Sequence, residues 1–222
     1  MDESDALRTA TDALSPDARS LWLSVRSGPN VGRFDLQRRC EALSNYGLHD
    51  NVPEEIRIQY ETSRNLFLYA WFVYRFHTVA ETHALSTLEF ALRLRVGDQF
   101  RQNFPKRLAT LSSLLQFACD TAILTNDKIE SRFRWVKRRA ETRASFARIH
   151  YMETNGLSEM TFSPDEIHPE PEDLSVDWLK VLVGVLPKRR NHLAHGSSTL
   201  TPSVLQTFDE VSCLINQLFP RP

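Results

Sequence analysis

Apolar residues recur every three or four positions from Asn51 to Gly97, which is the longest such pattern in the chain. This spacing places side chains on one face of an α-helix, so the region is predicted to be helical. Pro53 and the two acidic residues after it stand where the first turn of a helix favours them. The pattern fits one helix, or two helices with a kink near His77. Its apolar positions are Ile56, Tyr60, Leu66, Tyr69, Phe72, Val73, Phe76, Ala80, Ala84, Leu88 and Leu92.

Between Leu66 and Tyr74 this region becomes apolar on every side of the predicted helix. A helix of that kind is buried on several faces, as at the centre of a bundle or across a dimer interface. The aromatic density of residues 67–76 leads us to expect part of this stretch at a contact between two subunits.

Shorter helical patterns occupy most of the remaining chain, and a connection is predicted from Gly97 to Phe104. Residues 163–177 hold six acidic residues, three prolines and no Lys or Arg, which predicts a loop. The sequence therefore predicts an all-α fold, with an N-terminal helical extension at residues 1–50 and a helical domain at residues 51–222. The further helices are expected at about 15–25, 34–46 (with Leu36, Cys40 and Leu43 on its buried side), 105–119, 128–155, 175–195 and 202–219. Pro187 either kinks the helix at 175–195 or begins a new helix that runs to His195.

Composition narrows the class of protein. Hydrophobic residues make up 41% and charged residues 25% of the chain, and the 7 glycines favour helices over a sandwich of strands and turns. A net charge of −1 argues against a wholly basic nucleic-acid-binding protein. The three cysteines form no C-x-x-C pair, and Met1–Asp5 is acidic rather than apolar, so we expect reduced thiols, no signal peptide and a cytoplasmic protein. The most apolar run, Leu66–Tyr74, is far shorter than the roughly 20 residues that cross a bilayer, so no membrane contact is expected.

A basic segment runs from Lys128 to Arg148, with eight basic and two acidic residues and with aromatic residues interleaved. One interpretation is a solvated helix face whose long side chains cover apolar surface. The other is a surface for a phosphate backbone, on which Lys137, Arg138 and Arg139 would bind RNA. The acidic segment 163–177 could instead fold back on these residues and neutralise them.

A polar cluster, Lys188–Gly196, directly follows the apolar run Leu179–Leu186. Polar groups at the end of an apolar helix need partners or a wet cleft. On a helix, Asn191 and His195 are i,i+4 neighbours, so the amide can orient the imidazole ring. Arg190 can reach the same place with a guanidinium fork that matches phosphate oxygens.

Two other interpretations of the cluster stay open. Basic residues are favoured in the last turn of any helix, where they meet the negative end of its dipole. His192 and His195 stand at an i,i+3 spacing that permits metal binding, but no neighbouring Cys or acidic residue completes a ligand set. Cleavage of RNA strictly requires neither a metal nor a nucleophile from the protein, because an arginine for charge and a histidine for proton transfer suffice when the ribose 2′-OH is the nucleophile.

The segment Arg190-Asn191-His192-Leu193-Ala194-His195-Gly196 resembles the R-N-x-x-x-H signature of the HEPN superfamily, the small helical domains of bacterial toxins and defence systems. The flanking segments Leu85–Arg93 and Leu214–Phe219 are also similar to that group. The resemblance covers roughly residues 53–219, and its specific motif is the short Arg–His element.

This resemblance implies an up-and-down bundle of four to five helices that forms a homodimer, with the two motifs facing each other across a cleft. It implies a metal-independent endoribonuclease that needs no cofactor and leaves a 2′,3′-cyclic phosphate, or a module that has lost catalysis and binds RNA, a nucleotide or a partner protein such as an antitoxin. Arg190 would stabilise the phosphorane, His195 would act as general acid and base, and Asn191 would orient them. Glu81 and Glu89 would support Arg190, while Arg189 would contribute to RNA binding.

Overall fold

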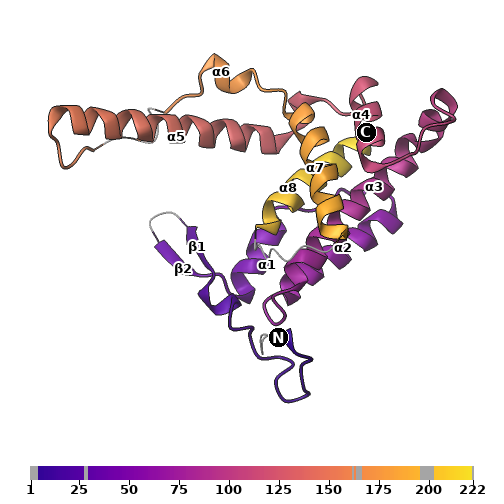
Figure 1. Cartoon of the computed structure of the whole chain (residues 1–222), viewed down its shortest axis with the longest axis horizontal. Helices are drawn as coiled ribbons and strands as arrows, with labels where there is room; N and C mark the ends of the chain where they lie inside the picture. Colours follow the sequence, from indigo (N-terminus) through magenta and orange to yellow (C-terminus); the bar gives the residue numbers. More distant parts are fainter. Residues whose placement is uncertain (1–4, 28–29, 162, 164–166, 196–202, 222) are drawn as a thin grey trace. The chain divides into compact units, whose positions relative to one another are not determined.

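A sharp turn separates two long helices in the computed structural model, which describes residues 5–27, 30–161, 163, 167–195 and 203–221 (Figure 1). Helix α2 spans Glu54–Tyr69 and α3 spans Phe76–Asn103, and residues 70–75 turn the chain between them. The predicted helical region therefore forms two helices, one of the two arrangements that the sequence leaves open. The fold is mostly helical, as predicted, with one short two-stranded sheet.

Helix α3 packs against α2, α4 (Leu111–Asp120) and α8 (Val204–Leu218). Three neighbours require buried positions around most of its circumference, and α3 buries residues at 84, 85, 87, 88, 91 and 92. The fully buried apolar side chains of this core come from all four helices and include Ile56, Phe67, Leu85, Leu88, Leu92, Leu114, Leu115, Phe208, Leu214 and Ile215.

The prediction of a connection at Gly97–Phe104 is wrong, because α3 continues through Gly97 to Asn103. Val96, Gly97 and Phe100 are all buried, and the ring of Phe100 lies 5.6 Å from that of Phe117 in α4. Packing of this last segment outweighs the roughly 1 kcal/mol that a glycine costs inside a helix. Helix α4 correspondingly begins at Leu111 rather than near Pro105, behind a capping box formed by Thr110 and Ser113.

The N-terminal region is only partly helical. Helix α1 (Leu36–Ser44) lies within the predicted helix at 34–46, but the helix predicted at 15–25 is wrong. In its place are a 3-10 turn, η2 (Ser20–Trp22), and an antiparallel pair of strands, β1 (Ser24–Ser27) and β2 (Asn30–Arg33). The expected buried side of α1 is also shifted, because Arg39 is fully buried while Cys40 is exposed.

Residues of this N-terminal region cover the turn between α2 and α3. The Asp17 amide donates to the Trp71 carbonyl at 2.9 Å, and the Asp17 carboxylate accepts from the Tyr74 amide at 3.1 Å. The guanidinium of Arg39 lies over the rings of Phe34, Phe67 and Trp71 at 5.0–5.7 Å. These contacts account for the burial of Phe67, Trp71 and Tyr74 within one chain, whereas Tyr69 of the same stretch is 52% exposed. The expected contact between two subunits at this stretch stays a prediction.

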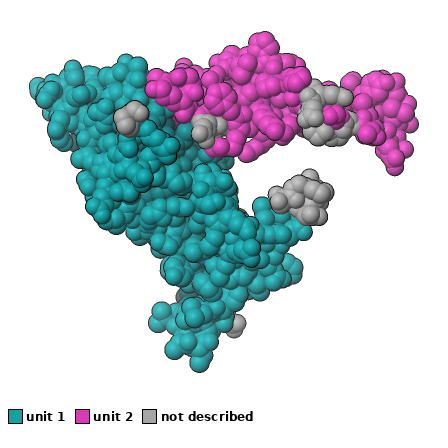
Figure 2. All heavy atoms as spheres, turned by 180° about the vertical axis from the view of Figure 1, so that it is seen from behind, with its two compact units in different colours: residues 1–124, 183–222 teal, residues 125–182 magenta. Residues whose placement is uncertain are grey.

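The chain divides into two compact units, residues 1–124 with 183–222, and residues 125–182 (Figure 2). The second unit contains η3 (Asn126–Lys128), α5 (Glu130–Asn155), α6 (Pro171–Leu174) and the start of α7 (Trp178–Ala194). Helix α5 ends at Asn155, as predicted, and the capping residue Gly156 adopts the left-handed conformation with φ of 64°. Helix α7 continues through Pro187 without ending there. At its start, the amide of Lys180 donates to the carboxylate of Asp177 at 3.1 Å.

Candidate functional site

Two consecutive arginines near the end of α7 contact acidic side chains of neighbouring helices. Arg190 approaches Glu89 of α3, with 3.2 Å between Nη2 and Oε2. Glu89 is buried and also pairs with Arg93 one turn further along α3, at 2.5 Å. The Arg190 side chain remains 36% exposed, so one side of its guanidinium faces solvent while the other is held by a carboxylate.

Arg189 enters a different and more buried network. Its Nη1 donates to Thr207 Oγ1 at 2.9 Å and lies 3.7 Å from Glu81 and 3.6 Å from Glu210. Thr207 in turn donates to Glu81 Oε1 at 2.7 Å. We call Arg189, Glu81, Thr207 and Glu210 the arginine clamp, because they join α7, α3 and α8 through one guanidinium.

The clamp places two buried carboxylates beside one cation. The Glu81 side chain is 6% exposed and that of Glu210 is 3% exposed. Burial raises the pKa of Glu210, against the opposing effects of a hydrogen bond from Gln206 and of the nearby Arg189 charge. Oxygen Oε2 of Glu210 accepts no hydrogen bond among the described residues, so its principal compensation is the guanidinium of Arg189.

The last turn of α7 presents the remaining motif residues to solvent. The His195 amide donates to the Asn191 carbonyl at 3.0 Å, which continues the helical hydrogen bonding up to His195. The side chains of Asn191, His192 and His195 are exposed. The Asn191 amide oxygen accepts from Arg190 at 3.5 Å, and within the described part of the chain no hydrogen bond joins the Asn191 and His195 side chains. Gly196, the final motif residue, lies outside the described residues.

The structure thus places the sequence-derived residues in distinct surroundings. Glu89 lies beside Arg190, while Glu81 lies beside Arg189 rather than Arg190. Arg189, predicted to bind RNA, has its Nη1 engaged inside the arginine clamp. His195 is on the same helix as both arginines and is open to solvent.

The basic helix α5 belongs to the other unit, and its residues divide into two groups. Arg139 and Arg143 pair with Asp173 of α6, the former at 3.0 Å, and Arg143 also pairs with Glu170 at 3.1 Å. The acidic segment therefore does fold back on the basic helix at these two arginines. Lys137 and Arg138 are exposed, and neither side chain has an ion pair within the described ranges.

Comparisons with protein-family models, with curated proteins and with solved structures find no match to this chain. The function must therefore be argued from its own residues. No described helix combines the length and the apolar character that a membrane crossing requires. Among the residues described, no group of three or more His, Cys, Asp or Glu side chains is arranged to hold a metal ion.

Sequence reasoning missed Thr207, Glu210 and the central place of Arg189. A signal was present, because Thr207 and Glu210 fall among the apolar positions of α8, where both side chains are buried. A polar group in such a position needs a partner. The partner comes from another helix, and the spacing within α8 alone does not identify it.

Proposed function

We propose that this protein is a metal-independent endoribonuclease of HEPN type, acting as a homodimer in bacterial toxicity or phage defence. Arg190 would stabilise the negative charge that develops on the phosphorane, and His195 would transfer protons. The 2′-OH of the substrate attacks its adjacent phosphorus, the 5′-oxygen of the next nucleotide leaves, and a 2′,3′-cyclic phosphate results. The protein supplies charge and protons and no covalent nucleophile.

The observation that carries this proposal is the pairing of Arg190 with buried Glu89, five residues before the exposed His195. A carboxylate behind a guanidinium limits its rotamers and leaves its outer edge for a phosphate, which matches the fork geometry of arginine. The exposed imidazole stands one turn beyond Asn191 on the same helix, where a polymer substrate can reach it. Arg189 and Arg190 tie α7 to α3 and α8 through their ion pairs, and a site of this kind needs such positioning.

Dimerisation would complete the proton transfers. Cyclisation needs a base for the 2′-OH and an acid for the leaving oxygen, and one chain offers a single His195. Two copies that face each other across their α7 termini would supply two imidazoles and two guanidinium groups. The proposal therefore includes a composite site and expects a dimer at the protein concentrations that support cleavage.

A nuclease assay on mixed RNAs in the presence of EDTA tests this function. We expect cleavage with cyclic-phosphate ends, and a loss of about 100-fold or more in His195→Ala and in Arg190→Ala. His192→Ala is the matched control, because His192 is also exposed, lies three residues from His195 and has no proposed role. Equal activity of the His195 and His192 variants would refute the assignment, and light scattering that shows a monomer would refute the composite site.

One observation favours a second function, a non-catalytic helical module that binds RNA or a partner protein. Glu89 is already shared between Arg190 and Arg93, so Arg190 belongs to a satisfied network that is stable without any substrate. This alternative predicts no cleavage by the wild type and RNA binding that is unchanged in His195→Ala.

A further inference from the structure

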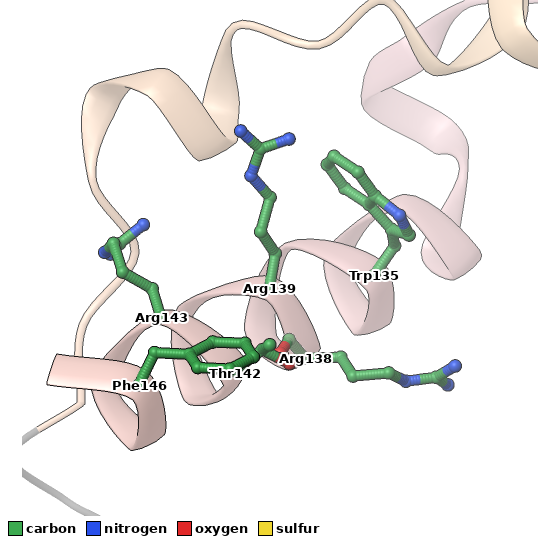
Figure 3. A pocket seen from close by; sticks show the side chains of 6 residues that line it. All are labelled: Trp135, Arg138, Arg139, Thr142, Arg143 and Phe146. Atoms are coloured by element: carbon green, nitrogen blue, oxygen red, sulfur yellow. The ribbon is translucent and has the colours of Figure 1, made fainter. Parts of the chain in front are cut away.

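A shallow hollow of about 350 Å³ lies along one face of α5, within the unit formed by residues 125–182. Figure 3 shows Arg139 and Arg143 directed to one side of the helix and Arg138 to the other, with the Phe146 ring lying between them. The lining residues are Trp135, Arg138, Arg139, Thr142, Arg143 and Phe146. We call this surface the α5 hollow.

The aromatic part of the α5 hollow is open to solvent. Phe146 is 68% exposed, although a phenylalanine that is left in water forgoes the roughly 1.5–3 kcal/mol that its burial contributes. Arg138, Thr142 and Phe146 follow one another at i,i+4 spacing and therefore form one stripe on the helix surface. Trp135 borders this stripe and has the guanidinium of Arg139 over its ring at 5.3 Å.

The charge of the hollow is only partly neutralised. Arg139 and Arg143 are paired with acidic residues of α6 and its cap, as described above. Arg138 faces away from that segment, is exposed, and has no ion pair or side-chain hydrogen bond among the described residues. An uncompensated guanidinium thus stands at i,i+8 from an exposed aromatic ring, with Thr142 between them.

We propose that the α5 hollow is a docking surface for single-stranded RNA, on which a base stacks against Phe146 and Arg138 binds a backbone phosphate. This inference rests on the proposed function and extends it by naming an unpaired strand as the form of RNA that is bound. Aromatic faces beside a positively charged track accept any base, because stacking does not depend on base-edge hydrogen bonds. A duplex keeps its bases stacked inside and could not use Phe146.

Charge favours RNA over a second copy of this chain as the occupant. A second α5 placed on the first would add another Lys137 and Arg138 to a surface that is already positively charged, and like charges at close range repel. A phosphate backbone instead supplies negative charge at regular intervals along the hollow. Its bases supply the apolar surface that the exposed ring lacks.

Fluorescence anisotropy with a labelled 2′-O-methyl oligouridine of about 12 nucleotides tests this docking, at about 50 mM salt. The probe cannot be cleaved, because its 2′-oxygen is blocked, so binding is measured apart from catalysis. We expect Phe146→Ala to weaken binding about tenfold and Phe146→Trp to retain it. Arg138→Gln should weaken binding and reduce its dependence on salt by about one phosphate contact.

Two variants serve as matched controls and should bind like the wild type. Phe133→Ala removes another exposed ring of α5 that does not line the hollow, and Arg101→Gln removes an exposed arginine of the other unit. The proposal is overturned if the wild type does not bind the probe, if Phe146→Ala binds as well as Phe133→Ala, or if Phe146→Ala only converts a dimer to a monomer. Cleavage that depends on His195 while Phe146→Ala remains fully active would overturn this surface and leave the proposed function standing.

Discussion

Replacing Arg189 with methionine should destabilise the protein much more than the same replacement at Arg190. Methionine keeps an unbranched apolar stem and removes only the guanidinium, so packing changes little. At position 189 the change leaves Glu81 and Glu210 without their shared cation, and Thr207 without a donor. At position 190 the partner Glu89 keeps its second cation, Arg93.

The size of the effect follows from the exposure of each partner. Removing one member of a fully buried ion pair costs roughly 3–5 kcal/mol, because the remaining charge is left desolvated. The carboxylates of the arginine clamp are 6% and 3% exposed, but Arg189 itself is 30% exposed, so water moderates the loss. We expect about 2–3 kcal/mol for Arg189→Met and about 1 kcal/mol or less for Arg190→Met.

Thermal unfolding followed by circular dichroism measures both variants. For a chain of this length about 1 kcal/mol shifts Tm by roughly 2–4 °C, so Arg189→Met should lower Tm by roughly 5–10 °C near neutral pH. The difference in Tm between the wild type and Arg189→Met should become smaller near pH 5. Burial already raises the pKa of Glu210, and loss of the guanidinium that opposes this rise will raise it further. A carboxyl with a raised folded-state pKa stabilises the protein below that pKa and loses this contribution as pH increases.

Two results would refute this reasoning. Equal Tm values for the two variants near neutral pH would show that the arginine clamp is not a stabilising network. If Arg189→Met lowers Tm by the same amount between about pH 5 and pH 8, the buried carboxylates of the arginine clamp do not titrate with folding. Arg189→Lys should have a Tm between those of the wild type and Arg189→Met. Lysine keeps the charge but loses the guanidinium fork that reaches several acceptors.

Three further predictions concern other parts of the chain. Phe67→Ala, which empties a fully buried position, should cost roughly 3–5 kcal/mol in urea unfolding. Asp173→Asn weakens the pairing with Arg139 and Arg143, so amides of residues 172–175 should exchange with deuterium faster than in the wild type, and an unchanged rate would contradict the role given to these pairs. Gly156→Ala should lower the free energy of unfolding by about 1 kcal/mol, because φ is 64° at this position. Gly47→Ala, at an uncrowded site without positive φ, should leave the free energy of unfolding unchanged.

The helical core was predictable because its signal is local. The apolar positions at the two ends of the stripe 56–92 and those of α8 are buried as their spacing predicts. The middle of the stripe differs, because residues 70–75 form a turn and Tyr69 is 52% exposed. The extension of α3 beyond Gly97 was not predictable by the same rule. It depends on contact between Phe100 and Phe117 of α4, which no pattern within α3 contains. The strands β1 and β2 were missed because each is only four residues long.

The candidate site was predictable only in outline. The i,i+4 relation of Asn191 and His195 is a property of one helix and could be derived from spacing. The choice between Arg189 and Arg190 as partner of Glu81 is a property of three helices together. It depends on which side of α7 faces α3 and α8, and the sequence of α7, basic at both positions, does not reveal that side.

The buried Arg39 makes the N-terminal region and the helical bundle interdependent. Burial lowers the pKa of Arg39 to about 10, which still leaves the group charged near neutral pH, and no carboxylate pairs with it among the described residues. Its compensation consists of three aromatic rings, the carbonyls of Phe34 and Phe67, and His77 Nε2, which lies 3.4 Å from Arg39 Nη1. A partly docked α1 would hold this charge in an apolar setting without these partners, so intermediate arrangements are unfavourable. Unfolding of residues 34–44 and loosening of the α2–α3 turn should therefore occur as a single cooperative event.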